Sequence, residues 1–222
     1  MKNTMSETET TYQLPRIGSP APDFSATSTL GNISLEDYKD KWFILFSHPA
    51  DFTPVCTTEF VAFQEIYPEL RELGVELIGL SVDSVSSHLA WIRNIEKNFN
   101  KEIEFPVIAD LDREVATKYG MIMPGESQTE TSRAVFVVDD KQVVRSIIYY
   151  PLTTGRNMKE ILRLVKALKT TDDKGVPTPA NWEPGDKVLV SPPKTVEAMN
   201  ERKMDPNLEC IDWYLCQKEL KE

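Results

Sequence analysis

Cysteine is the most reactive side chain in this sequence, and it occurs at Cys56, Cys210 and Cys216. The residues Thr53-Pro54 before Cys56 predict a helix start, because Thr is a frequent N-cap and Pro is favoured at the first helical position. Cys56 is therefore expected in the first helical turn, where unpaired backbone N–H groups and the helix dipole favour an anion. A cysteine in such a place is favoured as its nucleophilic thiolate. This position suits redox or acyl chemistry.

A thiolate that attacks an O–O bond needs donors aimed at the departing oxygen, as in any preorganised anion site. Thr53 offers a hydroxyl three residues upstream, and the backbone N–H of Cys56 offers another donor. An arginine would add positive charge, and Arg133 is the candidate, although its proximity does not follow from the sequence. On the cysteine and the helix start alone, catalysis and a small buried thiol both remain open.

Five apolar runs rich in branched and aromatic residues predict the buried strands that would carry this site. They span residues 42–46, 75–82, 105–108, 134–138 and 143–150. Helical patterns follow the first, second, third and fifth runs, over residues 60–73, 84–99, 111–119 and 158–168. Alternating strands and helices predict an α/β sheet with helices on its faces. The short polar connection 139–142 indicates an antiparallel hairpin, and therefore a mixed sheet.

The composition changes after about residue 170. Five of the fifteen prolines lie in residues 172–194, and proline at this density resists both helix and strand. We expect an extended arm, followed by a short C-terminal piece with a helix over 195–203. The predicted domains are 1–170 and a C-terminal extension, 171–222, while residues 1–15 are predicted to be a loose polar arm.

The bulk composition excludes several classes of protein. With 222 residues, 41% apolar and 27% charged, the chain is expected to be globular. A net charge of -10 argues against partners such as nucleic acid and anionic membranes. Neither a signal peptide nor a membrane span is visible, so we expect a cytoplasmic location. His48 and His88 are too few and too far apart in sequence for a zinc cluster, and we expect neither a metal nor a cofactor.

Several motifs together resemble one family. The pattern Pro49-x3-Thr53-x2-Cys56 resembles the active-site signature of peroxiredoxins, and residues 54–59 resemble its 1-Cys subgroup. Residues 15–24, 131–136 and 149–157 resemble further family segments in the expected order, so the similarity covers residues 15–222. The resemblance implies a thioredoxin-like α/β fold with a mixed central sheet and a smaller C-terminal extension. It also implies a thiol peroxidase that acts on hydrogen peroxide and organic hydroperoxides.

The same resemblance implies roles for residues inside the matching motifs. Cys56 is implied to attack the peroxide, while Thr53 and Arg133 bind and activate it. Pro49 is implied to shield the site, and Arg156 is implied to supply a second cation at the substrate. His48 and Glu59 are implied to orient the pocket. His88 is assigned to its helix without a function.

The two C-terminal cysteines are ambiguous on the residues alone. Cys210 and Cys216 form neither a Cys-x-x-Cys redox pair nor a zinc pattern, and two small packed thiols fit as well as a redox role. Their spacing resembles archaeal and bacterial members of the 1-Cys-like subgroup that use two cysteines. That resemblance implies Cys216 as the thiol that resolves oxidised Cys56, with Cys210 as an auxiliary. It further implies a thioredoxin- or glutaredoxin-like reductant, and homodimers assembled as a decamer of five dimers.

Other functions agree less well with the sequence. A thiol-disulfide oxidoreductase would need a cysteine where Glu59 stands. A serine hydrolase would need glycine at Asp83, because the run Gly79-Leu80-Ser81-Val82-Asp83 breaks the G-x-S-x-G pattern. A nucleotide-binding enzyme would need a glycine-rich phosphate motif, which is missing from the sequence. A redox sensor or holdase chaperone that uses the same sulfur stays open as an added role.

Overall fold

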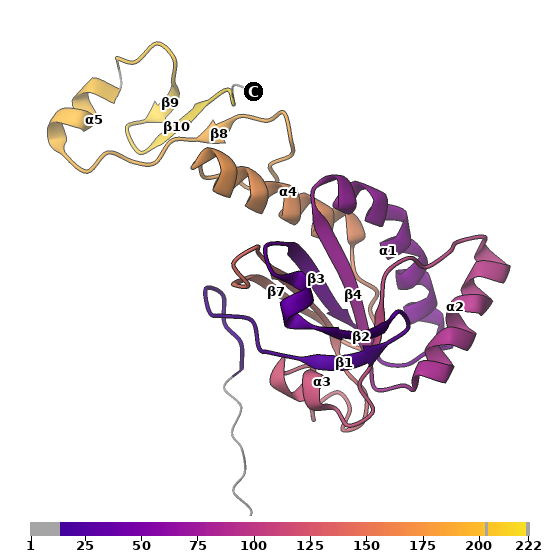
Figure 1. The fold of residues 1–222 in the computed structure, drawn as a ribbon. Helices are drawn as coiled ribbons and strands as arrows, with labels where there is room; N and C mark the ends of the chain where they lie inside the picture. Colours follow the sequence, from indigo (N-terminus) through magenta and orange to yellow (C-terminus); the bar gives the residue numbers. More distant parts are fainter. Residues whose placement is uncertain (1–13, 203, 221–222) are drawn as a thin grey trace, which may run out of the picture. The chain divides into compact units, whose positions relative to one another are not determined.

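A computed structural model describes residues 14–202 and 204–220. The chain divides into two compact units, the first ending at Arg156 and the second beginning at Asn157 (Figure 1). The predicted domain boundary at residue 170 stays a prediction. The predicted polar arm over residues 1–15 lies almost wholly outside the described residues.

The first unit is built on a seven-stranded mixed sheet, with the strand order β2-β1-β5-β4-β3-β6-β7. The strands β5, β4 and β3 are parallel to one another, and the other neighbouring strands pair antiparallel. The bounds of the strands are β1 (Ser25–Ser28), β2 (Gly31–Ser34), β3 (Trp42–Ser47), β4 (Val75–Ser81), β5 (Val107–Ala109), β6 (Arg133–Val138) and β7 (Val144–Tyr150). The five predicted strands, the hairpin and the mixed sheet are confirmed. The β1–β2 hairpin was not predicted, because its short, polar strands lack an apolar run.

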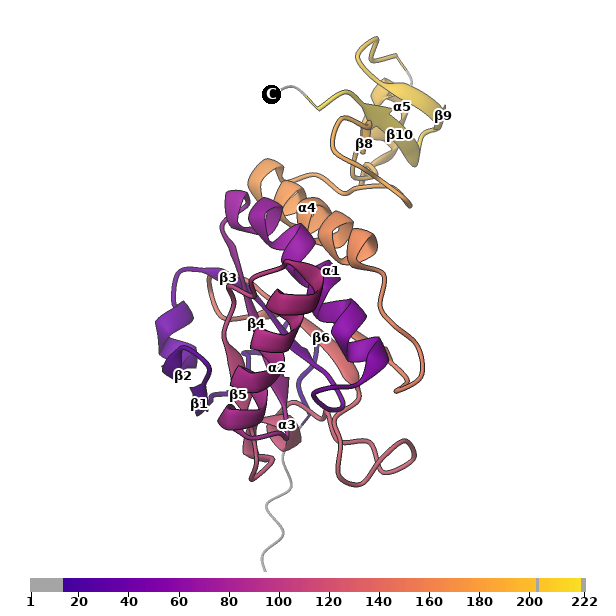
Figure 2. The same ribbon diagram turned by 90° about the vertical axis from the view of Figure 1, so that its right-hand side faces the viewer.

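Helices cover both faces of this sheet. α1 (Pro54–Glu72) and α2 (Val85–Phe99) lie side by side on one face (Figure 2). The single 3₁₀ turn η1 (Leu35–Tyr38) and α3 (Glu114–Lys118) contribute side chains to the core of the other face. α3 begins later than the predicted residue 111, because Arg113 has a φ of 62° and this left-handed conformation interrupts a right-handed helix.

The central strands are buried on both faces, which explains why their sequences read as continuous apolar runs. All six residues of β3 are buried. On one face, the ring of Phe46 stacks on Phe63 of α1, with centroids 3.9 Å apart. On the other, the ring of Phe136 in β6 meets Tyr119 edge-on at 5.0 Å. This double core holds the ends of the strands, where the reactive residues lie, in a rigid frame.

The second unit contains a longer helix and a small sheet. Its elements are α4 (Met158–Lys174), β8 (Val188–Leu189), α5 (Val196–Arg202), β9 (Glu209–Asp212) and β10 (Leu215–Lys218), with the sheet order β8-β10-β9. α4 runs past the predicted residue 168 and stops where Gly175 adopts a left-handed conformation. Trp182 packs with Ala167 and Val188 in a core of this unit. The helix predicted over 195–203 is confirmed as α5, although residue 203 lies outside the described part; the small sheet was not predicted.

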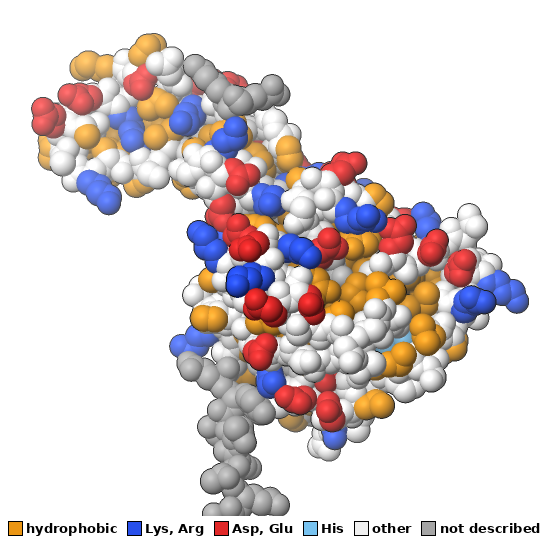
Figure 3. All heavy atoms as spheres, viewed as in Figure 1, with side chains coloured by type: hydrophobic (Ala, Val, Ile, Leu, Met, Phe, Trp, Pro, Cys, Tyr) orange, Lys and Arg blue, Asp and Glu red, His pale blue; other side chains and the backbone are white. Residues whose placement is uncertain are grey.

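The surface of the first unit carries charges of both signs. On the face of the first unit drawn in Figure 3, acidic and basic side chains are interspersed, and the described residues there form no basic stripe. None of the described helices is long and apolar enough to cross a membrane.

Replacing Phe136 by alanine should strongly destabilise the first unit. Phe136 is fully buried and contacts the rings of Tyr119 and Tyr149. Such truncations cost about 3–5 kcal/mol. Leu111, which is 64% exposed, provides the control, since Leu111→Ala should change stability by about 0.5 kcal/mol or less. Urea unfolding measures both variants, and equal losses would contradict the assigned core.

Candidate active site

Cys56 lies in the first turn of α1, as predicted, and its thiol is free and fully buried. Thr53 is the N-cap residue, but its hydroxyl makes no capping hydrogen bond. Instead, it donates to the carbonyl of Ala50 at 2.8 Å. Thr53 therefore occupies the predicted N-cap position, but the expected capping hydrogen bond of its hydroxyl is not formed. The oxygen of Thr53 keeps lone pairs with which to accept a hydrogen bond from another molecule.

Arg133 contacts the sulfur directly. Its Nη1 donates to Cys56 Sγ at 3.3 Å and to Glu59 Oε2 at 2.7 Å. Its Nε and Nη2 donate to the carbonyl of Leu152, at 2.9 and 2.7 Å. Arg133 is the first residue of β6, and β6 pairs with β3. The loop after β3 leads to the first turn of α1, where Cys56 lies. Strand pairing thus brings together two residues that are 77 positions apart.

Glu59 anchors a second arginine in the same cluster. Arg156 donates from Nε to Oε1 of Glu59 at 2.8 Å and from Nη2 to Oε2 at 2.7 Å, and its backbone N–H donates to Oε1 at 2.9 Å. Its Nη1 donates to the carbonyls of Ser47 and Ala134, at 2.9 and 2.8 Å. The hydrogen bonds of Arg156 are thus directed at Glu59 and at two strand ends, whereas Arg133 is the arginine bonded to Cys56 Sγ.

The cluster carries an excess of positive charge. Burial by itself would raise the pKa of Glu59, but the charge and hydrogen bonds of Arg156, with the charge of Arg133, hold that pKa below its ordinary value. Glu59 is therefore ionised at neutral pH, and two guanidinium groups face one carboxylate. One buried positive charge remains uncompensated beside the Cys56 sulfur. A negative charge at that sulfur would balance the cluster.

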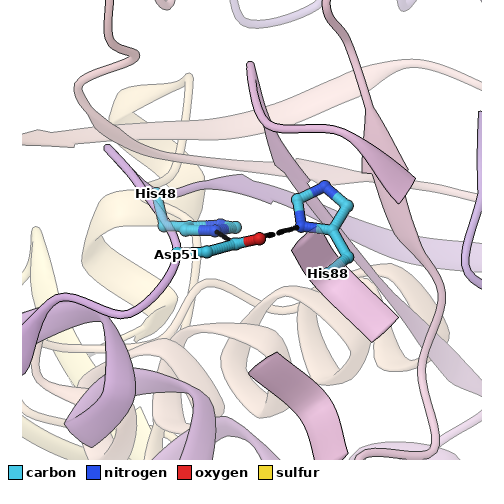
Figure 4. A group of neighbouring side chains, drawn as sticks. All are labelled: His48, Asp51 and His88. Atoms are coloured by element: carbon cyan, nitrogen blue, oxygen red, sulfur yellow. Dashed lines mark hydrogen bonds and ion pairs between the residues drawn. The ribbon is translucent and has the colours of Figure 1, made fainter. Parts of the chain in front are cut away.

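His48 belongs to a separate buried group. Its Nε2 lies 2.9 Å from Asp51 Oδ1, and Nδ1 of His88 lies 2.8 Å from Asp51 Oδ2 (Figure 4). The expectation that the two histidines are too far apart to share a site is wrong, because both rings lie against Asp51, while the assignment of His88 to its helix is confirmed. β3 and β4 are parallel neighbours, so His48, just after β3, and His88, in the first turn of the helix after β4, meet at the same edge of the sheet. Their places after adjacent strands were the signal that could have revealed the group.

The same three residues have the spacing of a metal site, but one of their rings lacks the second hydrogen bond that a metal-bound histidine makes. The ligand atoms of His48, Asp51 and His88 lie within 4.8 Å of one another. A metal-bound histidine almost always donates its second ring N–H to a partner. Nδ1 of His48 is buried and has no hydrogen-bond partner in the described part of the chain. The three residues therefore fit a hydrogen-bonded group better than a metal centre.

The remaining predicted residues occupy two places. Pro49 is buried in the loop after β3. Cys210 and Cys216 lie opposite each other in β9 and β10 of the second unit and are joined by a disulfide, which was not predicted from the sequence. The structure thus assembles Cys56, Arg133, Glu59 and Arg156 into one cluster and pairs the C-terminal cysteines with each other.

Comparison with known proteins agrees with this arrangement. Residues 17–147 match the AhpC/TSA family, and residues 167–203 match the C-terminal domain of 1-Cys peroxiredoxin. The chain is 56% identical over 208 residues to peroxiredoxin 2 of Caldanaerobacter subterraneus subsp. tengcongensis, covering 93% of this chain and 94% of that protein. It is 54% identical over 218 residues to a peroxiredoxin of Aquifex aeolicus, covering 93% and 98%.

Solved structures show the same fold. A yeast mitochondrial 1-Cys peroxiredoxin is similar with a TM-score of 0.81 and 42% identity, over 93% of this chain and 100% of that one. Peroxiredoxin 6 of Arenicola marina, solved as a cysteine-to-serine mutant, is similar with a TM-score of 0.83 and 36% identity, over 93% and 99%. The predicted thioredoxin-like fold with a C-terminal extension is thereby confirmed.

Replacing Glu59 by glutamine should destabilise the protein at neutral pH by about 3–5 kcal/mol, because it leaves two buried arginines without their anion. Since the pKa of Glu59 is lowered on folding, its stabilisation is complete above its ordinary pKa and is lost as the pH falls. The difference between the wild type and Glu59→Gln should therefore shrink below about pH 4. Urea unfolding at several pH values measures the free energy of unfolding of both proteins and therefore this difference.

Glu160 provides the matched control, because it also pairs with an arginine, Arg163, but its side chain is 47% exposed. Glu160→Gln should cost at most about 1 kcal/mol. If Glu59→Gln cost no more than this control, the buried cluster would not hold the site together as described.

Proposed function

This chain belongs to the AhpC/TSA family and is a peroxiredoxin, an oxidoreductase of the peroxidase class, and we propose that it reduces hydrogen peroxide and organic hydroperoxides with Cys56 as the attacking sulfur. The observation that carries this proposal is the 3.3 Å contact between Arg133 Nη1 and Cys56 Sγ inside a buried cluster of net positive charge. The first product is a cysteine sulfenic acid.

The proposed first step breaks the O–O bond. The Cys56 thiolate attacks the nearer oxygen, an S–O bond forms as the O–O bond breaks, and the departing oxygen takes up the proton that the thiol released on ionising and leaves as water or an alcohol. Arg133 donates to the peroxide oxygens as charge develops on them, together with the backbone N–H of Cys56. The Thr53 hydroxyl donates to Ala50, so its oxygen is left to accept a hydrogen bond from the peroxide and orient the substrate.

The surrounding residues support this step. Glu59 and Arg156 hold Arg133 in place, since both arginines share the Glu59 carboxylate. The charge of Arg156 also acts on the substrate at short range. Pro49 shields the site as a buried residue of the preceding loop. His48 orients the pocket through its ring, which packs against Phe60 one turn beyond the reactive cysteine, at a centroid distance of 4.8 Å.

The sulfenic acid is then resolved by the C-terminal cysteines. The Cys216 thiol attacks the sulfur of oxidised Cys56, releasing water and forming a Cys56–Cys216 disulfide. Cys210 attacks Cys216 in turn, which frees the Cys56 thiol and leaves the Cys210–Cys216 disulfide. Two observations support this order: Cys210 and Cys216 are bonded to each other, and Cys56 is free.

A thioredoxin- or glutaredoxin-like dithiol protein is the proposed donor that reduces the final disulfide. The yeast mitochondrial relative is described as resolving its thiol through glutathione and thioredoxin systems, which supports a donor of this kind. We further propose a homodimer, with five dimers forming a decamer, a cytoplasmic location, and a C-terminal extension that begins at residue 171. These proposals rest on the likeness to the family.

The cysteine mechanism predicts a distinct result for each serine variant. Cys56→Ser should consume no peroxide. Cys216→Ser should react once and stall as sulfenic acid, while Cys210→Ser should stop at the Cys56–Cys216 disulfide. Peroxide consumption with a thioredoxin system measures turnover, and non-reducing mass spectrometry identifies the trapped species. If Cys210→Ser and Cys216→Ser both turn over normally while Cys56→Ser is inactive, the protein uses one cysteine.

Replacing Arg133 by lysine should slow the oxidation of Cys56 by about 10²–10³-fold, because lysine keeps the charge but loses the planar fork that contacts the sulfur and the Leu152 carbonyl together. Stopped-flow measurement of the reaction with hydrogen peroxide gives the rate constant. Arg71→Lys is the control, since the Arg71 side chain is 57% exposed and pairs with Glu104 at the surface. Equal rates in both variants would remove Arg133 from the mechanism.

A further inference from the structure

We propose that His88, acting through Asp51, is a positioning residue for the loop formed by residues 48–53, which leads from β3 to Cys56. The inference rests on the proposed function, because it assigns His88 a part in the peroxidase site. His88 itself lies on α2, in a different element from the loop that it would position.

Asp51 is the point at which the loop is held. Its side chain is almost wholly buried and accepts from Nε2 of His48 at 2.9 Å and from Nδ1 of His88 at 2.8 Å (Figure 4). Its backbone N–H donates to Oδ2 of Asp83, which follows β4, at 3.0 Å. Asp51 thus joins the loop both to α2 and to Asp83 after β4, while the backbone of His48 bonds to Leu80 and Thr131.

The hydrogen-bond partners determine where the ring protons lie. An ionised carboxylate only accepts hydrogen bonds, so the ring nitrogens that face Asp51 both carry a proton. Nε2 of His88 also faces an acceptor, the carbonyl of Ile108, at 3.2 Å. Nδ1 of His88 therefore carries the proton that holds Asp51, while Nε2 faces the Ile108 carbonyl. Burial would raise the pKa of Asp51, but the hydrogen bonds from both histidines lower it well below its usual range, which agrees with an ionised carboxylate that accepts from both rings.

His48 is left in one defined form. Its proton lies on Nε2, toward Asp51, so that Nδ1 is a bare acceptor. Burial lowers the pKa of His48, in spite of the neighbouring Asp51, which agrees with a neutral ring. Nδ1 is buried and has no hydrogen-bond partner in the described structure.

The loop also stores conformational strain at one residue. Phe52 has a φ of 55°, in the left-handed region that residues other than glycine rarely adopt. Its side chain is 56% exposed, so side-chain packing does little to hold this conformation. The residue on one side is Asp51, and on the other is Thr53, the N-cap of α1. Release of Asp51 would let the loop relax, and Thr53 and Cys56 would move with it.

Two substitutions of His88 separate positioning from simple packing. The Nδ2 of asparagine takes the place of Nδ1 and keeps a donor toward Asp51. The Nε2 of glutamine takes the place of Nε2 and keeps a donor toward Ile108. The rate constant for oxidation of Cys56 by hydrogen peroxide should fall about tenfold or more in His88→Gln, while His88→Asn rescues most of it. Leu89→Ala, at an exposed neighbouring position of α2, should not change it.

The expected difference must appear in the rate and not only in stability. Melting temperatures of both His88 variants are measured in parallel; a structural role alone predicts that rate and melting temperature fall together in both. Equal rates in His88→Asn and His88→Gln, whether high or low, would overturn the proposal. If His88→Gln does not fold, Asp51→Asn serves in its place, because its amide replaces one accepting oxygen by an NH₂ donor that would face a ring N–H, and it should cause the same loss.

A spectroscopic readout is independent of activity. The chain contains only two histidines, so ¹⁵N NMR of histidine-labelled protein without a tag shows two ring systems. The wild type should show one ring with a proton on Nδ1, from His88, and one ring with its proton on Nε2 and a bare Nδ1, from His48; His88→Asn should retain the second. Two rings that are both bare at Nδ1 in the wild type would contradict the inference. Failure of the wild type to consume peroxide, with the expected NMR pattern intact, would instead refute the proposed function.

Discussion

The structure of the reactive centre depends on one shared carboxylate. Glu59 lies between two buried guanidinium groups, and each of them also binds backbone carbonyls at strand ends or in the loop that follows β7. Without this anion, two positive charges would be enclosed in a low-dielectric interior, which is strongly unfavourable. With it, α1, β3, β6 and the loop after β7 are locked to one another around Cys56. The same groups therefore stabilise the fold and determine the charge that the sulfur experiences.

A second polar group lies at the same edge of the sheet and is organised in the same way. There, the carboxylate of Asp51 joins two rings from different elements. In both groups an acidic residue of the segment 48–59 pairs with basic side chains from distant parts of the chain: Glu59 with Arg133 and Arg156, and Asp51 with His88. His48, the other partner of Asp51, belongs to the segment itself. These pairs explain how a short, irregular loop maintains a defined shape.

Much of this could be predicted from the sequence, because local patterns carry it. The strands could be recognised as continuous apolar runs because β3 and β6 are buried on both faces. The helix start at Pro54 places Cys56 in the first turn without reference to any distant residue. The partners of Arg156 could not be predicted, because they depend on which strands are neighbours. The meeting of His48 with His88 was not predicted, although their places just after two parallel strands pointed to it. The short polar strands of the second unit, and the pairing of Cys210 with Cys216 across them, left no apolar signal.

The complete burial of Cys56 limits which molecules can reach its sulfur. The sulfur has no exposed surface, so no second thiol can form a bond to it in this conformation. In the two-cysteine cycle proposed above, the first turn of α1 would therefore have to open locally before the Cys216 thiol reaches the sulfur. The frequency of that opening would set an upper limit on turnover, and it would also set how long the oxidised sulfur waits in reach of a second oxidant.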